Sequence, residues 1–152
     1  MTLRIWQLTS IVLSALVAGM FYGPWAALSR SFSTLDSTVF LPIVDRMNKN
    51  MAPIMTVLMP ASFLSMVPVL IMSYSAHPAV FYLTLAAFAL LIVALLVTVL
   101  VEVPIVEQIV TWMPSMLPDN WQQLRDRWGR FHIIRIIAGV SGLILLVVAA
   151  IF

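Results

Sequence analysis

Tryptophan, arginine and histidine recur at helical spacing in the segment that leads into the last apolar stretch. The residues are Trp121, Arg125, Trp128, His132, Arg135 and Gly139, and the intervals between them are four, three, four, three and four. A helix turns through about 100° per residue, so these residues share one stripe if the helix is continuous. Ionised groups are costly among lipid tails and normally face a bundle interior or a wet cavity. His132 and Arg135 lie nearest the apolar core and are therefore candidate site residues.

A second interpretation applies to the polar end of this stripe. Trp and Arg are also common at a membrane–water interface, where the rings lie at headgroup level and arginine side chains extend to water. We expect this interfacial role for Trp121, Arg127 and Arg130. Arg125 and Trp121 stay candidates for contact with a ligand, because they begin the stripe that reaches His132.

A carboxylate lies beside a proline where the third apolar stretch ends. Pro104 removes a backbone donor and clashes with the preceding turn, so we expect a kink or break beside Glu102. A carboxylate at a kink can face the bundle interior, and a structural ion pair with Arg125 or Arg135 is the alternative. Glu107 would lie in the first turn of the helix that restarts at Pro104, where the helix dipole favours a negative charge. It is also a candidate substrate-binding residue.

The ligands that a metal would need are present, but their spacing fits no known motif. Glu102, Glu107 and His132 are chemically suitable for iron, manganese or zinc. The sequence contains neither HExxH nor the Glu-x-x-His pair of di-iron bundles. Haem is not favoured either, because His77 lies in a turn on the opposite side from His132. The cofactor is therefore left open, and the protein is compatible with using none.

The composition places these residues in a lipid bilayer. Of the 152 residues 62% are hydrophobic and only 9% are charged, whereas a soluble protein has about 25% charged residues. The absence of cysteine excludes disulfides and thiolate chemistry. A net charge of +2 gives no basic patch for nucleic acid. We expect a single membrane domain over residues 1–152, with the bilayer and a hydrophobic small molecule as partners.

Four stretches are long enough to cross a bilayer core, which needs about 20 apolar residues. The expected spans cover approximately residues 5–28, 52–74, 79–101 and 133–152. The first connection is expected to hold a short helix over Val39–Val44, and the third an interfacial segment over residues 104–131. The predicted fold is therefore all-α: a polytopic membrane protein with a four-helix transmembrane bundle and short amphipathic or interfacial helices in its first and third connections.

Two further features bear on packing within the spans. Gly19 and Gly23 lie four residues apart, which predicts close packing of the first span against a neighbouring helix. Pro60 and Pro68 are kink positions that could widen the bundle enough to hold a ligand. Whether the chain forms a homo-oligomer is left open.

Lysine and arginine gather in the two long connections, and this asymmetry predicts the orientation. Only Arg4 lies on the other side, together with the Ser75–Pro78 turn that joins the second and third spans as a hairpin. We expect both long connections in the cytoplasm, both termini outside, and the bacterial inner (plasma) membrane as the location.

The chain resembles the anthrone-oxygenase-like family of small four-helix membrane proteins, long catalogued as a domain of unknown function. The resemblance covers nearly the whole chain. It rests on Gly19 with its following aromatic cluster, on Glu102-Val103-Pro104-Ile105, and on the closing Trp121-x-x-x-Arg125-x-x-Trp128-x-x-x-His132-x-x-Arg135 signature. Family members more commonly carry asparagines around the Val-Pro element, where this chain has Glu102 and Glu107.

The resemblance implies an oxidoreductase of the oxygenase type, which converts an anthrone to its quinone with molecular oxygen and without a dedicated cofactor. Such a reaction requires a base, a cation or donor for the oxyanion, and an apolar pocket. By this resemblance His132 or Glu102 is the base, and Arg135 or Arg125 steadies the anion. The side chains expected to stack on a flat aromatic substrate are Trp128, Trp112 and Tyr22.

Two functions without chemistry also fit these residues. The first is a membrane protein that binds a quinone, lipid or haem, with its arginines at the polar end of the ligand. The second is a structural membrane subunit whose charged stripe docks a partner in the cytoplasm. A ligand found bound to the purified protein would distinguish the first function from catalysis. Loss of a complex when the charged stripe is mutated would indicate the second.

Overall fold

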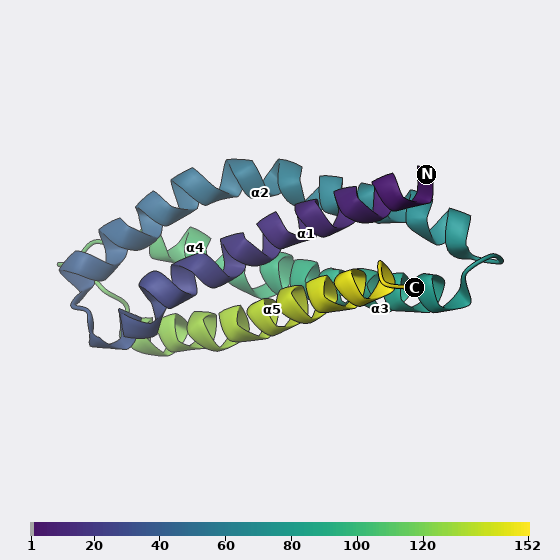
Figure 1. Ribbon diagram of the computed structural model, residues 1–152. Helices are drawn as coiled ribbons and strands as arrows, with labels where there is room; N and C mark the ends of the chain where they lie inside the picture. The colour runs from purple at the N-terminus through teal and green to yellow at the C-terminus, as the bar shows by residue number, and fades with distance from the viewer. Residues whose placement is uncertain (1) are drawn as a thin grey trace.

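The computed structural model describes residues 2–152, and four long helices dominate it (Figure 1). The helical elements are α1 (Thr2–Ala27), the 3-10 helix η1 (Ser29–Thr34), α2 (Ser37–Ser73), α3 (Pro78–Val97), the π-helical η2 (Thr98–Glu102), α4 (Val103–Ile109) and α5 (Trp121–Ala149). Residues 2–152 contain four helical stretches long and apolar enough to span a membrane. The predicted all-α membrane bundle is therefore confirmed, and the chain is an integral membrane protein.

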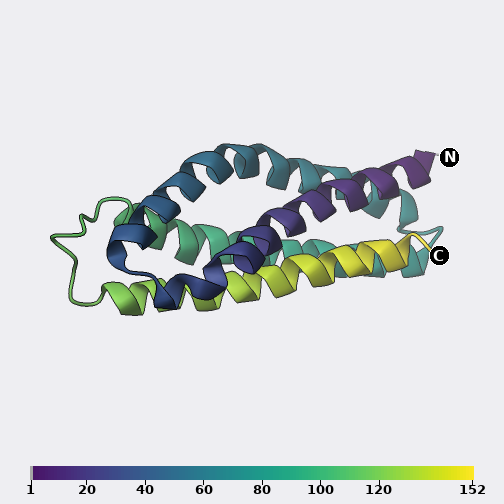
Figure 2. The same cartoon turned by 60° about the vertical axis from the view of Figure 1, so that its left-hand side comes forward.

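Both ends of the chain lie at the same end of the bundle. Figures 1 and 2 place the two termini beside the turn between α2 and α3, and the two long connections at the opposite end. The α2–α3 connection is the expected short hairpin, because α2 ends at Ser73 and α3 begins at Pro78. The basic stripe at the start of α5 therefore lies at the end of the bundle that carries the long connections.

The second span is longer than expected. The short helix predicted over Val39–Val44 is not separate, since it forms the first turns of α2, which continues to Ser73. Proline occurs within α2 at positions 42, 53, 60 and 68, and the helix is visibly curved in both views (Figures 1 and 2). A membrane helix tolerates such prolines because neighbouring groups satisfy the freed backbone carbonyls. The missing hydrogen bonds bend α2 without ending it.

Hydroxyl groups join α1 to α2 where the bundle was expected to widen. The Ser10 hydroxyl donates to the carbonyl of Ser65 at 2.9 Å, and the hydroxyls of Ser14 and Ser62 lie 2.9 Å apart. All four serines are buried. Small hydroxyl side chains of this kind let membrane helices approach closely and bond across their interface. This face of the second span is therefore a helix contact.

Close packing at glycine occurs in α5 and not in α1. Gly19 and Gly23 are exposed, and a Cβ atom at either position would meet nothing within 4 Å. The prediction that this pair packs against a neighbouring helix was therefore wrong for this bundle. A Cβ at Gly139 would lie 3.0 Å from a ring carbon of Phe21, and one at Gly142 would lie 3.4 Å from the carbonyl of Ala87. Glycine in α5 thus lets the last span approach both α1 and α3.

Buried apolar side chains form two clusters along the bundle. The mid-bundle cluster contains Val17, Phe21, Met59, Met66, Ala87, Leu91, Ala94, Ile136, Ala138 and Leu146. The connection-end cluster contains Phe32, Phe40, Leu41, Val44, Ile105, Ile109 and Trp128. On α5, His132 and Arg135 lie between Trp128 of one cluster and Ile136 of the other.

Candidate functional site

The third span changes its helical geometry where it reaches Glu102. The N–H of Val103 donates to the carbonyl of Thr98, five residues back, so residues 98–102 form a π-turn. Pro104 follows directly in the first turn of α4 and, because it has no N–H, cannot donate a hydrogen bond to the preceding π-turn. The expected kink or break is thus a change of winding within a continuous helical path. Glu102 is left only 4% exposed, as is typical of residues at π-turns near functional sites.

Glu102 forms an ion pair with Arg135 across the third and last spans. Its Oε2 lies 2.7 Å from Nη1 of Arg135, and the two side chains are 5% and 12% exposed. Arg125, the other expected partner, instead places its Nε 3.0 Å from the carboxylate of Asp126. The pair is short and largely removed from water, which makes its geometry rigid.

His132 is held by hydrogen bonds at both ring nitrogens. Nε2 lies 3.1 Å from the carbonyl oxygen of Phe21, and Nδ1 lies 2.8 Å from Nη2 of Arg135. A carbonyl only accepts and a guanidinium only donates, so Nε2 carries the proton and Nδ1 accepts. Glu102 Oε1 lies 3.3 Å from Nδ1. In this neutral tautomer Nδ1 has no proton to give, so that carboxylate oxygen gains no hydrogen bond from His132.

Arg135 is the centre of this arrangement. Its Nη1 also donates to the hydroxyl of Thr98 at 3.2 Å, and its guanidinium carbon lies 4.5 Å from the centre of the Phe21 ring. We call Thr98, Glu102, His132 and Arg135 the buried polar cluster. It joins the third and last spans directly, and the Phe21 carbonyl and ring attach it to α1.

The buried polar cluster contains atoms that no hydrogen bond satisfies. Within residues 2–152 the buried side-chain atoms without a partner are Thr84 Oγ1, Glu102 Oε1, Trp128 Nε1 and Arg135 Nε. Two belong to the cluster, and a third lies one helical turn from His132. Native proteins satisfy most buried polar groups, so several together require an explanation. Chemically they offer one carboxylate oxygen that can accept a proton and two N–H groups that can donate.

Trp128 lies between the buried polar cluster and the start of α5. It is 6% exposed, and its ring stacks on Phe32 with centroids 5.4 Å apart and planes at 17°. The centroid of the His132 ring is 5.7 Å from that of Trp128. The predicted stripe is therefore real: Arg125, Trp128, His132 and Gly139 are all buried on one face of α5.

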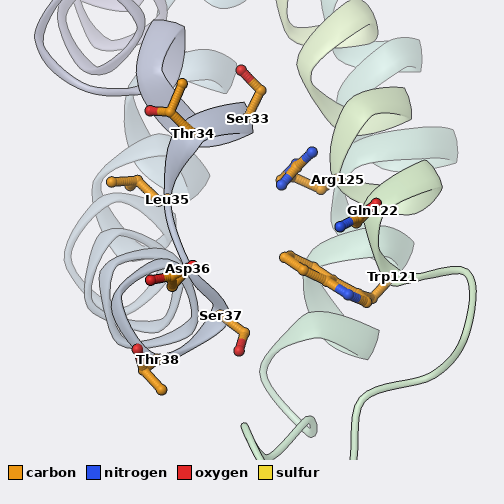
Figure 3. A pocket seen from close by; sticks show the side chains of 9 residues that line it. All are labelled: Ser33, Thr34, Leu35, Asp36, Ser37, Thr38, Trp121, Gln122 and Arg125. Carbon is orange, nitrogen blue, oxygen red and sulfur yellow. The ribbon is translucent and has the colours of Figure 1, made fainter.

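A pocket of about 440 Å³ lies at the start of the same stripe (Figure 3). Its lining residues are Ser33, Thr34, Leu35, Asp36, Ser37, Thr38, Trp121, Gln122 and Arg125. Figure 3 shows Trp121 and Arg125 on the wall from α5, facing the segment that links η1 to α2. Arg125 is 8% exposed, and its guanidinium carbon lies 5.1 Å from the centre of the Trp121 ring. No member of the buried polar cluster lines this pocket, since His132 follows Arg125 by about 10 Å along the helix.

The remaining predicted residues lie outside the buried polar cluster. Trp112 is partly buried against the connection-end cluster. Tyr22 is 51% exposed and packs on Trp25 with centroids 5.7 Å apart. Glu107 is exposed on α4, and His77 precedes α3 at the opposite end of the bundle.

The metal candidates are not brought together. Glu102 and His132 are neighbours in the buried polar cluster, whereas Glu107 is exposed. Across the described chain, residues 2–152, no three histidine, aspartate or glutamate side chains gather as a metal site. This arrangement can support acid–base and hydrogen-bonding chemistry by Glu102, His132 and Arg135.

Two members of the arrangement were missed in the sequence. Thr98 precedes Glu102 by one helical turn, so its spacing from the carboxylate could have indicated it. The Phe21 carbonyl has no sequence signal, because every residue carries a carbonyl and only the packing of α1 on α5 selects this one.

The sequence also matches a known protein family. The model of the anthrone oxygenase family matches residues 40–145, which include every side chain of the buried polar cluster. No individual curated protein matches the chain, and no solved structure does. The matched stretch covers most of the sequence and three of the four spans. The chain therefore belongs to the anthrone oxygenase family.

Proposed function

We propose that this membrane protein oxidises a hydrophobic polycyclic aromatic ketone of the anthrone type to its quinone with molecular oxygen, and that Glu102 is the base. Membership of the anthrone oxygenase family supports the reaction class. The observation that carries the assignment of Glu102 is its carboxylate, which is buried, held by Arg135 through Oε2, and free of any hydrogen bond at Oε1. A positioned base with a free oxygen is what abstraction of a carbon-bound proton requires.

The proposed reaction consumes one molecule of oxygen and releases one of water. Glu102 Oε1 takes a proton from the ring CH₂ opposite the ketone, and the C–H electron pair delocalises onto the ketone oxygen. The resulting enolate transfers electrons to oxygen, and a carbon–oxygen bond forms. The proton on Glu102 then passes to the peroxide. Loss of the second C–H proton breaks the O–O bond, so that a new C=O forms and hydroxide leaves as water.

The other side chains of the cluster have supporting roles in this proposal. Arg135 fixes the carboxylate through Oε2 and holds Nδ1 of His132, so both are positioning residues. His132 is the less suitable base, because both of its nitrogens are already engaged. The 3.3 Å between Nδ1 and Glu102 Oε1 would let His132 share a captured proton if Arg135 released that nitrogen.

The pocket at the start of α5 is proposed to bind polar ring substituents of the substrate other than its ketone. Arg125 and Trp121 offer a cation and an aromatic face there, and Asp36 offers an acceptor on the opposite side. This pocket lies at the end of the bundle with the long, arginine-rich connections. We infer that this end faces the cytoplasm of a bacterial inner membrane and that both termini lie outside.

The test compares Glu102→Gln with Asp45→Asn in membranes that contain the protein. Asp45 is paired with Lys49 on the surface at 2.7 Å, so its variant removes a carboxylate far from the buried polar cluster. An anthrone is supplied with ¹⁸O₂, and quinone is measured by absorbance and mass. Membranes without the protein give the rate of spontaneous oxidation, which is subtracted. We expect Glu102→Gln to lower the rate at least about 100-fold, Asp45→Asn to keep it, and the quinone to gain one ¹⁸O.

A folded Glu102→Gln variant with the parent rate would refute the assignment of the base. Oxygen derived from water instead of ¹⁸O₂ would refute the oxygenase reaction. If the parent binds the quinone without any turnover, the result favours the alternative of a protein that holds a quinone, lipid or haem.

A further inference from the structure

The indole N–H of Trp128 is a buried donor without an acceptor. Among residues 2–152 its Nε1 has no hydrogen-bond partner, and the residue is 6% exposed. A buried tryptophan normally finds a partner for this group, because leaving it unpaired costs free energy. Trp128 therefore has an unpaired N–H donor next to the buried polar cluster.

The ring cannot easily turn to find an acceptor elsewhere. Phe32 stacks on it with ring centroids 5.4 Å apart, and the His132 ring packs against it with centroids 5.7 Å apart. The His132 ring is itself fixed by its bonds to the Phe21 carbonyl and to Arg135. The indole is thus held in place by aromatic neighbours from η1 and from its own helix. A donor fixed before the ligand arrives is the arrangement that stabilises a developing charge most effectively.

The unsatisfied atoms near His132 complement one kind of molecule. Glu102 Oε1 can only receive a proton when ionised, whereas Trp128 Nε1 and Arg135 Nε can only donate hydrogen bonds. The Arg135 guanidinium already donates to Glu102, His132 and Thr98, so the indole is the donor without another role. A ketone with an acidic C–H group supplies the matching pair. It loses a proton from carbon, and its oxygen gains negative charge that needs a donor.

We propose that Trp128 Nε1 donates a hydrogen bond to the ketone oxygen of the substrate and stabilises the enolate formed when Glu102 takes the ring proton. This inference rests on the proposed function and assigns its oxyanion donor. In this step a C–H bond breaks, the proton goes to Glu102 Oε1, and the electron pair moves through the ring to the oxygen. No oxidant takes part, so the step can be measured without oxygen.

The test is deuterium exchange into the ring CH₂ of an anthrone, measured by mass under anaerobic conditions in membranes with the protein. Trp128→Phe keeps a six-membered aromatic ring and removes the N–H together with the five-membered ring that carries it. Trp6→Phe is the matched control, since Trp6 lies near the opposite end of the bundle. We expect Trp128→Phe to slow the exchange about 10-fold to 100-fold, with Trp6→Phe unchanged.

The possible results distinguish failure of this inference from failure of the proposed function. If Glu102→Gln abolishes exchange but Trp128→Phe exchanges at the parent rate, the inference is refuted and the proposed function stands. If the parent does not accelerate exchange, both are refuted.

A second measurement needs no substitution at Trp128. In protein labelled with ¹⁵N at its indoles, addition of the quinone product should shift one of the five tryptophan N–H signals downfield, as expected for a new hydrogen bond. The shifted signal should be the one that is missing from Trp128→Phe. A shift confined to other tryptophans would overturn the assignment even if the variant folds poorly.

Discussion

The Glu102–Arg135 pair should contribute strongly to stability, and a double-mutant cycle can measure how much. Arg135→Met keeps a long side chain but removes the fixed positive charge that pairs with the Glu102 carboxylate, which is 5% exposed. Breaking a buried pair by removing one partner costs about 3–5 kcal/mol. Glu102→Gln leaves a buried guanidinium and should cost about 3 kcal/mol for the same reason.

The double variant Glu102→Gln/Arg135→Met should be more stable than the two single effects predict. It contains no buried charge at this position, so the loss is that of the hydrogen bonds from Arg135 to His132 and Thr98. Each such bond has a charged donor and contributes about 2 kcal/mol, so we expect a total loss of about 4 kcal/mol. The resulting coupling energy should exceed about 2 kcal/mol in favour of the pair.

The assay is reversible unfolding in bicelles by added denaturing detergent, followed by circular dichroism. The exposed Asp45–Lys49 pair is the control, and its coupling should be about 0.3–0.5 kcal/mol because it lies within one helix in water. Additive effects of Glu102→Gln and Arg135→Met, or a cost below about 1 kcal/mol for each, would refute the burial argument. The double variant should also remain inactive, which separates the chemistry from the packing.

Three further predictions follow from other parts of the chain. Gly139→Ala should destabilise the protein by about 1–3 kcal/mol in thermal unfolding, because its methyl group would lie 3.0 Å from a buried ring carbon, whereas Gly19→Ala should change stability by less than about 0.5 kcal/mol. Arg125→Gln should raise KM several-fold and leave kcat unchanged if the pocket at the start of α5 binds the substrate; an unchanged KM would exclude that role. The chain has no native cysteine, so single cysteines can report its orientation. An impermeant thiol reagent on intact cells should label Ala76→Cys, in the turn expected outside, but not Ser115→Cys, in the connection expected in the cytoplasm. The reverse pattern would show the opposite orientation.

The spans and the α5 stripe could be predicted because they depend on local patterns. Four apolar stretches of sufficient length define the bundle, and the spacing of Trp128, His132 and Arg135 places them on one face whatever lies opposite. The choice of Arg135 over Arg125 as the partner of Glu102 could not be predicted. It depends on how far α5 is shifted along the third span, which no local pattern encodes.

The remaining differences also come from contacts between helices. Gly19 and Gly23 form a motif that fits a close helix contact, but the bundle places α1 with these residues outward. The hydrogen bond from His132 to the Phe21 carbonyl involves a backbone group, so no side-chain type predicts it. The π-turn before Glu102 arises beside Pro104, yet a proline alone does not reveal whether a helix will bend, end or rewind.

The ion pair between Glu102 and Arg135 also affects how the chain inserts into the membrane during synthesis. The ribosome delivers the first three spans before α5, so Glu102 enters the membrane without its partner. An arginine opposes insertion by about 2.5–3.5 kcal/mol at the centre of a span and by less towards its end. Arg135 lies near the polar end of the last apolar stretch, and the carboxylate already present offsets part of its cost. The last helix therefore depends on the third for its entry, and a chain that stops before α5 would retain an unpaired carboxylate that membrane quality control could recognise.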